Sequence, residues 1–261
     1  MTCTPGNSYI IKSGDTLYMI AQNQLGDGNR WREIMKPDGT PFTEADAGNL
    51  QVGQEICLPS GFPPPPGGGG KGSLRDMLEA LGAFESGLPS GDPNQYKVEN
   101  SLGFMGKYQF GEALLIDLDY YQAKDDVYYG HGADKNYWLG TWKGKNGINS
   151  KEQFKNSPDV QEKAILEAFK LNWQRVNTAL GEQGKSVNNY LDQQKTFKDN
   201  WVSKTITITL SGILAGAHLR GPYGVARLLL SDEVSHDEYG TSILRYMEEY
   251  GGYNVTPEEF S

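Results

Sequence analysis

The carboxyl group of Glu85 is the side chain in this sequence best placed for acid–base chemistry. It lies in the segment Phe84-Glu85-Ser86-Gly87, which closes a predicted apolar helix, and the aromatic residues Tyr108 and Phe110 follow in a glycine-rich segment. Apolar and aromatic neighbours that exclude water raise the pKa of a carboxyl group, so that it stays protonated near neutral pH. Such a group can act as a general acid that protonates a leaving oxygen atom. The alternative is that Glu85, one of 33 acidic residues, is a solvated helix end.

The elements that must position Glu85 are predicted to be mostly helical. Ser73 can cap a helix that starts at Leu74 and is terminated by Ser86-Gly87. A polar insertion, 88–99, comes next, and further helices are expected at 112–120, 158–180 and 211–230. Four tryptophans are expected to form the core or cleft walls: Trp138, Trp142, Trp173 and Trp201.

Three ordered motifs in this part of the chain resemble those of the lysozyme-like fold of soluble lytic transglycosylases and goose-type lysozymes. They are Glu85-Ser86, Gly103-Phe104-Met105-Gly106-Lys107-Tyr108-Gln109, and Ala217-His218-Leu219-Arg220-Gly221-Pro222. The third fits only in outline, because the family has an aromatic residue at the position of His218 and Asn at that of Leu219. The insertion between the first two motifs is also longer than usual.

This resemblance implies an enzyme that cleaves β-1,4-linked N-acetylated amino sugars, with peptidoglycan ahead of chitin as the polymer. Glu85 would be the general acid, and Ser86, Tyr108, Gln109 and His218 would line the sugar subsites. For His218, a buried and hydrogen-bonded histidine is an equal alternative. The histidines His131 and His236 are expected at the surface.

The need for a second carboxylate depends on the reaction. A hydrolase usually uses two carboxylates, and the candidates are Glu99, Asp117 and Asp119. The resemblance to transglycosylases implies that none is needed, because groups of the substrate assist. Two other functions stay open: a chitinase-like hydrolase, or a non-catalytic binding protein with a degenerate lysozyme-like domain. A peptidase is disfavoured, because the sequence lacks a catalytic Cys–His pair and a zinc signature. We expect no metal and no cofactor.

The first 60 residues have a different pattern. Tyr9-Ile10-Ile11 reads as a strand, and Ser13-Gly14-Asp15-Thr16 as a turn that can cap a helix containing Leu17, Ile20 and Ala21. Trp31, Ile34 and Met35 suggest a second helix. The segment 50–59 reads as a turn and a second strand that pairs with the first.

These residues resemble the LysM family, with matches at Tyr9 to Leu17, at Ile20-Ala21 and from Leu50 to Pro59. The resemblance implies binding of chitin oligomers or the glycan of peptidoglycan. The ligand would lie between two loops, formed by Gly14, Asp15, Thr16 and Leu17 and by Met35, Lys36, Pro37 and Asp38. For Asp15 and Thr16, helix capping alone is an equal alternative. The stretch 36–49 departs from the family, because it is longer than usual and lacks the common Asn-Pro.

The two cysteines, Cys3 and Cys57, bracket this small domain. We expect them to form a disulfide, because a domain of about 55 residues has little core of its own. Two unrelated buried thiols are the alternative. A disulfide favours an oxidising compartment and therefore secretion. The first residues, Met1 to Pro5, show no basic stretch followed by an apolar one, so no signal peptide is expected within this sequence.

The predicted fold class is α+β, with three parts. A βααβ module occupies 1–60, a Pro- and Gly-rich linker occupies 61–71, and a mostly α-helical domain occupies 72–261. The net charge of −9 argues against nucleic acid as a partner. No apolar run is long enough to span a membrane. We expect a monomer whose partners are peptidoglycan or chitin chains.

Overall fold

The computed structural model describes residues 8–12, 14–25, 28–58, 71–124, 135–237 and 239–260. The chain divides into two compact units, Met1–Pro65 and Pro66–Ser261. Each has hydrophobic clusters of its own. Small antiparallel sheets and helices occur in both, consistent with the predicted α+β class. Within the described ranges, no helix combines the length and apolar character that crossing a bilayer requires.

The first unit is built on two short antiparallel strands. Its elements are β1 (Ser8–Ile10), α1 (Leu17–Leu25), the 3-10 helix η1 (Gly28–Glu33), α2 (Glu44–Ala47) and β2 (Glu55–Cys57). Tyr9 of β1 lies opposite Ile56 of β2, so the predicted strand pair is confirmed. The expected second helix is the 3-10 helix η1, and the short helix α2 was not predicted. Cys3 lies outside the described residues, so its disulfide with Cys57 stays a prediction.

The core of the first unit is formed by α1, η1 and β2 together with the segments around them. Its buried members are Ile11, Leu17, Ile20, Ala21, Ile34, Phe42 and Ile56. Six of these seven residues lie in the segments that the sequence pattern singled out as strands or helices. Phe42 is the exception, because it lies in the stretch 36–49, which departs from the LysM family pattern and for which no element was predicted.

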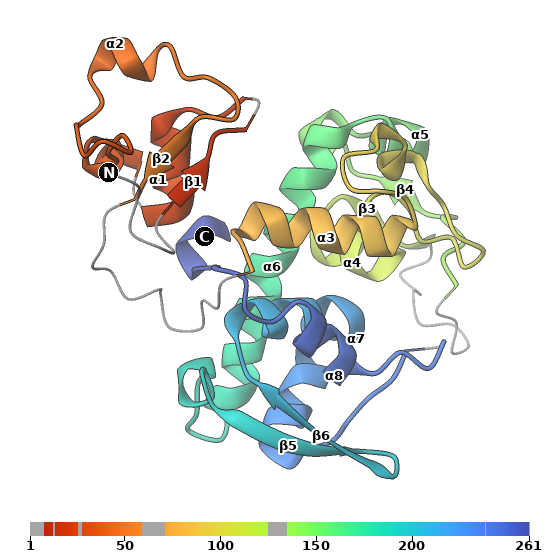
Figure 1. Ribbon diagram of the computed structural model, residues 1–261. Helices are drawn as coiled ribbons and strands as arrows, with labels where there is room; N and C mark the ends of the chain where they lie inside the picture. The colour runs from red at the N-terminus through yellow and green to blue at the C-terminus, as the bar shows by residue number, and fades with distance from the viewer. Residues whose placement is uncertain are drawn as a thin grey trace. The chain divides into compact units, whose positions relative to one another are not determined.

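The second unit is mostly helical, with two short strand pairs. Its elements are α3 (Leu74–Ser86), η2 (Pro93–Lys97), α4 (Glu112–Asp117), β3 (Tyr121–Gln122), β4 (Thr141–Trp142), η4 (Lys145–Gly147), α5 (Lys151–Lys155), α6 (Pro158–Gly181), η5 (Val187–Asn189), β5 (Gln194–Asp199), β6 (Val202–Thr207), α7 (Leu210–Ser231), α8 (Ile243–Glu249) and η6 (Pro257–Phe260). Figure 1 shows α3, α6 and α7 as the main helices of this unit.

The helix that carries Glu85 begins and ends as its sequence predicts. Ser73 caps α3 through a reciprocal pair of bonds, because its Oγ accepts from the Asp76 amide and Asp76 Oδ2 accepts from the Ser73 amide. At the other end, Gly87 adopts φ 68°, a left-handed conformation that favours glycine and terminates the helix. Glu85 is therefore held in the last turn of a well-capped helix.

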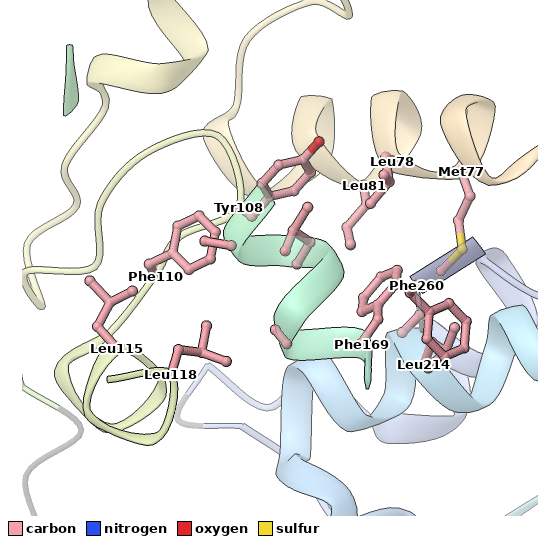
Figure 2. Packing of buried hydrophobic residues seen from close by; sticks show 14 of the residues in the cluster. Met77, Leu78, Leu81, Tyr108, Phe110, Leu115, Leu118, Phe169, Leu214 and Phe260 are labelled. Carbon is pink, nitrogen blue, oxygen red and sulfur yellow. The ribbon is translucent and has the colours of Figure 1, made fainter. Parts of the chain in front are cut away.

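One large core connects α3, α6 and α7. Figure 2 shows Leu78 and Leu81 of α3, Tyr108 and Phe110 of the glycine-rich segment, and Leu214 of α7 around the central helix α6. α6 carries Phe169 into the same cluster, where its ring meets that of Phe260 edge to face, with the ring centroids 6.4 Å apart. This packing fixes α3 and α7 relative to each other and so fixes the residues at their facing ends.

The helix α7 bends at Gly221, where φ is 70° and ψ is 166°. Pro222 follows and cannot continue a regular helix without loss of a hydrogen bond. The predicted single helix 211–230 is therefore two helical segments, and His218 lies before the bend.

Two features of the second unit were not predicted. The strands β5 and β6 form an antiparallel hairpin, with Asp199 opposite Val202 at its end. The helix α8 begins at Ile243 and is capped by Ser242. The expectation that Trp201 belongs to the core or a cleft wall is wrong, because its side chain stands at the hairpin turn with an exposure of 101%.

Candidate functional site

The carboxyl group of Glu85 lies where α3, α7 and α8 meet. The Tyr246 hydroxyl on α8 donates a hydrogen bond of 2.7 Å to Glu85 Oε1. On α7, His218 Nε2 lies 3.5 Å from the same oxygen. The side chains of Glu85 and His218 are 14% and 6% exposed. The structure thus brings together two of the predicted site residues, and adds Tyr246, which sequence analysis missed.

Aromatic rings surround this carboxyl group. Phe84 meets Tyr246 and Tyr250 edge to face, with ring centroids 5.6 Å and 6.5 Å away. The guanidinium group of Arg245 lies 5.1 Å above the Phe84 ring. Burial, and then the charge of Glu85, raise the pKa of Tyr246 far above its usual range. Tyr246 therefore stays protonated and acts as a hydrogen-bond donor at every pH at which the protein would work.

Both contacts of Glu85 are made by one of its two oxygen atoms. Within the described part of the chain, Oε1 receives the Tyr246 bond and faces His218, whereas no hydrogen bond reaches Oε2. His218 Nδ1 is also buried without a hydrogen-bond partner there. A carboxyl group held through one oxygen keeps the other for proton transfer, which is the geometry that a general acid needs.

Ser86 does not have the predicted sugar-binding role. Its Oγ donates to the backbone oxygen of Gly82 at 2.6 Å and accepts from the Leu88 amide at 3.3 Å. The hydroxyl is buried and satisfies the end of α3. Ser86 therefore shapes the exit from the helix rather than facing a ligand.

The prediction that Tyr108 lines a sugar subsite is also wrong, because the side chain is fully buried. Its hydroxyl donates to Glu162 Oε2 on α6 at 2.7 Å. Gln109 is half-buried and turns back on its own segment, with Nε2 donating to the oxygen of Gly106 at 2.9 Å. Its φ of 49° belongs to the tight turn between Met105 and Phe110, whose backbones pair.

A buried lysine explains why this glycine-rich segment holds its shape. Lys107 Nζ lies 2.6 Å from Glu79 on α3 and 2.9 Å from Glu162 on α6, and its side chain is 1% exposed. Burial lowers the pKa of Lys107, but the hydrogen bonds that its ammonium group donates to the two carboxylates outweigh burial, so that the pKa is raised. The lysine stays charged and links α3 to α6.

The three candidates for a second carboxylate all form ion pairs. Asp117 pairs with Arg175, and Asp119 pairs with Lys143, whose hydrogen bond lowers the pKa of Asp119. Glu99 lies between Lys151 and Lys155, at 2.8 Å and 3.1 Å. Burial raises the pKa of Glu99, but the two lysines outweigh it and leave the pKa lowered. None of these contacts involves Glu85.

His236, which was expected at the surface, is partly exposed and forms an ion pair. Its Nε2 lies 2.8 Å from Asp199 Oδ1 at the end of β5, and the two side chains are 31% and 18% exposed. The pair ties the segment before α8 to the hairpin. His131 lies outside the described residues.

The first predicted glycan-binding loop is stabilised by its own side chains. Asp15 Oδ2 accepts from the Tyr9 hydroxyl at 2.9 Å and from the Lys12 amide at 2.8 Å. Thr16 caps α1, because its Oγ1 accepts from the Met19 amide at 3.1 Å. Leu17 is buried in the core. The exposed part of this loop is therefore Gly14 and Thr16, with Asp15 half-buried.

The second predicted loop is a turn closed by pairing of Met35 with Pro41. Asp38 Oδ1 accepts from the Thr40 hydroxyl at 2.6 Å and from the Thr40 amide at 2.9 Å, and these two bonds lower the pKa of Asp38. Lys36 reaches Asp46 at 3.0 Å. Met35 also pairs through its backbone with Cys57. Met35 and Asp38 are exposed, whereas Lys36 and Pro37 are half-buried.

Comparison with known proteins identifies the first unit in part. Residues 9–37 match the family model of the LysM domain. LysM domains bind glycan chains such as peptidoglycan or chitin, so this match indicates a glycan-binding module. The match ends where the departing stretch 36–49 begins. Searches among curated proteins and among solved structures found no match for the chain. The lysozyme-like resemblance of the second unit therefore stays a prediction.

Proposed function

We propose that this protein is a secreted enzyme that cleaves β-1,4-linked N-acetylated amino sugars of cell walls, with peptidoglycan ahead of chitin as the polymer. The observation that carries the proposal is the carboxyl group of Glu85, which is nearly buried, is held through Oε1 by Tyr246, and receives no hydrogen bond at Oε2 from the residues that the structure describes. The LysM match supports it, because a glycan-binding module in the same chain brings a glycan to the second unit.

In this mechanism, protonated Glu85 donates its proton from Oε2 to the glycosidic oxygen as the bond to the anomeric carbon breaks. Tyr246 orients the carboxyl group and stabilises the carboxylate that forms, because its hydroxyl already donates to Oε1. His218 Nε2 lies 3.5 Å from the same oxygen and packs beside the carboxyl group. The anomeric carbon then bonds to the oxygen of water or of a substrate hydroxyl group, and the proton that this oxygen loses returns to the Glu85 carboxylate.

Substitution of Glu85 by glutamine tests the proposal. The variant keeps the shape of the side chain but cannot deliver a proton, so cleavage should fall by about 10²–10⁴-fold. The measurement is loss of turbidity of cell-wall suspensions, with mass spectrometry of the products from peptidoglycan and from chitin hexamer. Glu233→Gln is the matched control, since its side chain is 55% exposed and, within the described ranges, its ion pair is with Arg227. Equal activity of Glu85→Gln and wild type would refute the assignment.

A non-catalytic glycan-binding protein is the second candidate. The observation that favours it is a departure from the motif of the similar enzymes. These enzymes have an aromatic residue and Asn where this chain has His218 and Leu219. It predicts that wild type binds peptidoglycan or chitin through its first unit and releases no product from either. Product analysis of the wild-type protein therefore separates the two functions.

A further inference from the structure

The turn of the β5–β6 hairpin presents a tryptophan to solvent. Trp201 has an exposure of 101%, and the adjacent Val202 has 67%. Asn200 adopts φ 55°, the left-handed conformation that tight hairpin turns require and that Asn tolerates. An indole ring carries more apolar area than most side chains, so full exposure to water costs free energy that a bound partner would recover.

The hairpin below this turn is anchored to the rest of the unit. Phe197 and Ile206 are 1% and 3% exposed and pack into the second hydrophobic cluster. Lys204 Nζ lies 2.7 Å from Glu248 on α8. At the turn itself, Asp199 is held by His236 at 2.8 Å. The indole of Trp201 therefore projects from a fixed support, which reduces the entropy that binding would cost.

The size and surroundings of the exposed area indicate the class of partner. Stable protein interfaces bury about 800 Å² on each side, whereas a tryptophan side chain supplies roughly 150–250 Å². Around Trp201 and Val202 the exposed hairpin side chains are polar, and those of Thr196 and Thr205 bond to each other. One flat apolar ring within a polar, hydrogen-bonding surface suits a sugar ring, which has an apolar face and a polar edge.

We propose that Trp201 stacks on a sugar ring of the same glycan polymer that the LysM module binds, as a second contact point on the wall. The inference rests on the proposed substrate class but not on catalysis. Two linked contacts on one polymer raise the overall affinity, because the second binding event is intramolecular. A short oligomer engages the first unit alone, so the contribution of Trp201 is expected only with long polymers.

The test uses the full chain in a Glu85→Gln background, so that cleavage does not alter the polymer. Trp201→Ala is compared with its parent by co-sedimentation with insoluble peptidoglycan and chitin, and by calorimetry with chitin tetramer. Loss of stacking should weaken binding to the insoluble polymers by about tenfold. Affinity for the tetramer should not change. Trp201→Phe should restore part of the loss, because it restores an aromatic ring. Tyr239→Ala, which removes another exposed aromatic ring, is the matched control.

The outcomes separate this inference from the proposed function. If the parent binds the polymers and Trp201→Ala binds them equally well, the inference is wrong and the proposed substrate class stands. If the parent binds neither polymer nor tetramer, both are wrong. Vesicles of phosphatidylglycerol are tested in parallel, and a loss of vesicle binding without a loss of polymer binding would identify a lipid surface as the partner and overturn the inference.

Discussion

The hydroxyl of Tyr246 donates a 2.7 Å hydrogen bond to Glu85 Oε1, although 161 residues separate the two along the chain. The bond connects the last turn of α3 with α8. It forms because both helices pack on α7, which also carries His218 to within 3.5 Å of the same oxygen. Among the described residues, the hydrogen-bond donor to the candidate acid thus comes from a helix near the end of the chain.

Removal of this hydroxyl should affect both stability and cleavage. Tyr246→Phe deletes a hydrogen bond to a carboxylate that is 14% exposed. Hydrogen bonds to charged groups contribute about 1.5–3 kcal/mol, so the free energy of unfolding should fall by roughly that amount. Under the proposed function, cleavage should slow as well, because the carboxyl group loses its orientation. Urea unfolding and turbidity loss measure the two effects.

Tyr250→Phe is the control for that variant. The ring of Tyr250 packs against that of Tyr246, with the ring centroids 5.4 Å apart. Within the described residues, however, the buried hydroxyl of Tyr250 has no hydrogen-bond partner. Its removal should leave the free energy of unfolding unchanged or raise it, because an unsatisfied buried polar group is a cost. Equal losses from the two variants would show that the hydroxyl of Tyr246 has no special role.

The buried ion pairs of Lys107 should make a large contribution to stability. Lys107→Met leaves the carboxylates of Glu79 and Glu162 without their shared cation. Breaking a buried pair costs about 3–5 kcal/mol, but these carboxylates are about one third exposed, so we expect roughly 2–3 kcal/mol. Chemical denaturation measures the loss.

Lys163→Met is the matched control, because Lys163 lies on α6 and, in the part of the chain that is described, its Nζ bonds to Asn146 in an exposed position. It should change the free energy of unfolding by less than about 0.5 kcal/mol. The hypothesis fails if the two methionine variants unfold at the same denaturant concentration.

The first unit offers a test by pH. The Thr43 backbone and side-chain bonds, with a smaller contribution from Lys36, lower the pKa of Asp46 from 3.8 to about 2. A lowered pKa in the folded state stabilises the fold above pH 3.8, and this stability is lost as the pH falls from 3.8 towards 2. Carboxyl carbon NMR should give a midpoint near the lower value. Thr43→Val should raise it more than Lys36→Met does; the opposite order would refute this explanation.

Local signals in the sequence were sufficient for α3 and for the strand pair of the first unit. Ser73 and Gly87 mark the ends of α3 by chemistry that acts within a few residues, and the structure shows both caps. The alternation Phe197, Val202, Ile206 around Asp199-Asn200 carries a similar hairpin signal for β5 and β6, which sequence analysis overlooked.

The site could not be predicted as fully, because its contacts are long-range. Tyr108 has the residue type expected in a sugar subsite, but its hydroxyl is satisfied by Glu162, 54 residues away, which no local pattern reveals. Tyr246 is one of 15 tyrosines, and only the packing of α8 singles it out. Glu85 and His218 could be proposed from the sequence because their motifs are local, and the structure places the two side chains close together.

Gly106 of the glycine-rich segment lies against Gln161 of α6 and leaves no room for a side chain. Gly106 has φ 79°, and a Cβ atom there would lie 2.1 Å from Gln161 Oε1. Gln161 cannot move aside cheaply, because it accepts from the Lys107 amide and donates to the oxygens of Tyr96 and Phe154. Gly106→Ala should therefore lower the free energy of unfolding by about 3–5 kcal/mol, from backbone strain, overpacking and a lost hydrogen bond.

Gly147→Ala separates these causes. Gly147 has a similar φ of 81°, but a Cβ atom there would meet nothing within 4 Å. It should cost only the backbone strain, about 1–2 kcal/mol. Denaturant unfolding of both variants measures the difference, which reports the contact between the glycine-rich segment and α6. If Gly106→Ala lowers the free energy of unfolding no more than Gly147→Ala does, then Gln161 moves aside without loss of stability. Gly106 would then be required only for its positive φ.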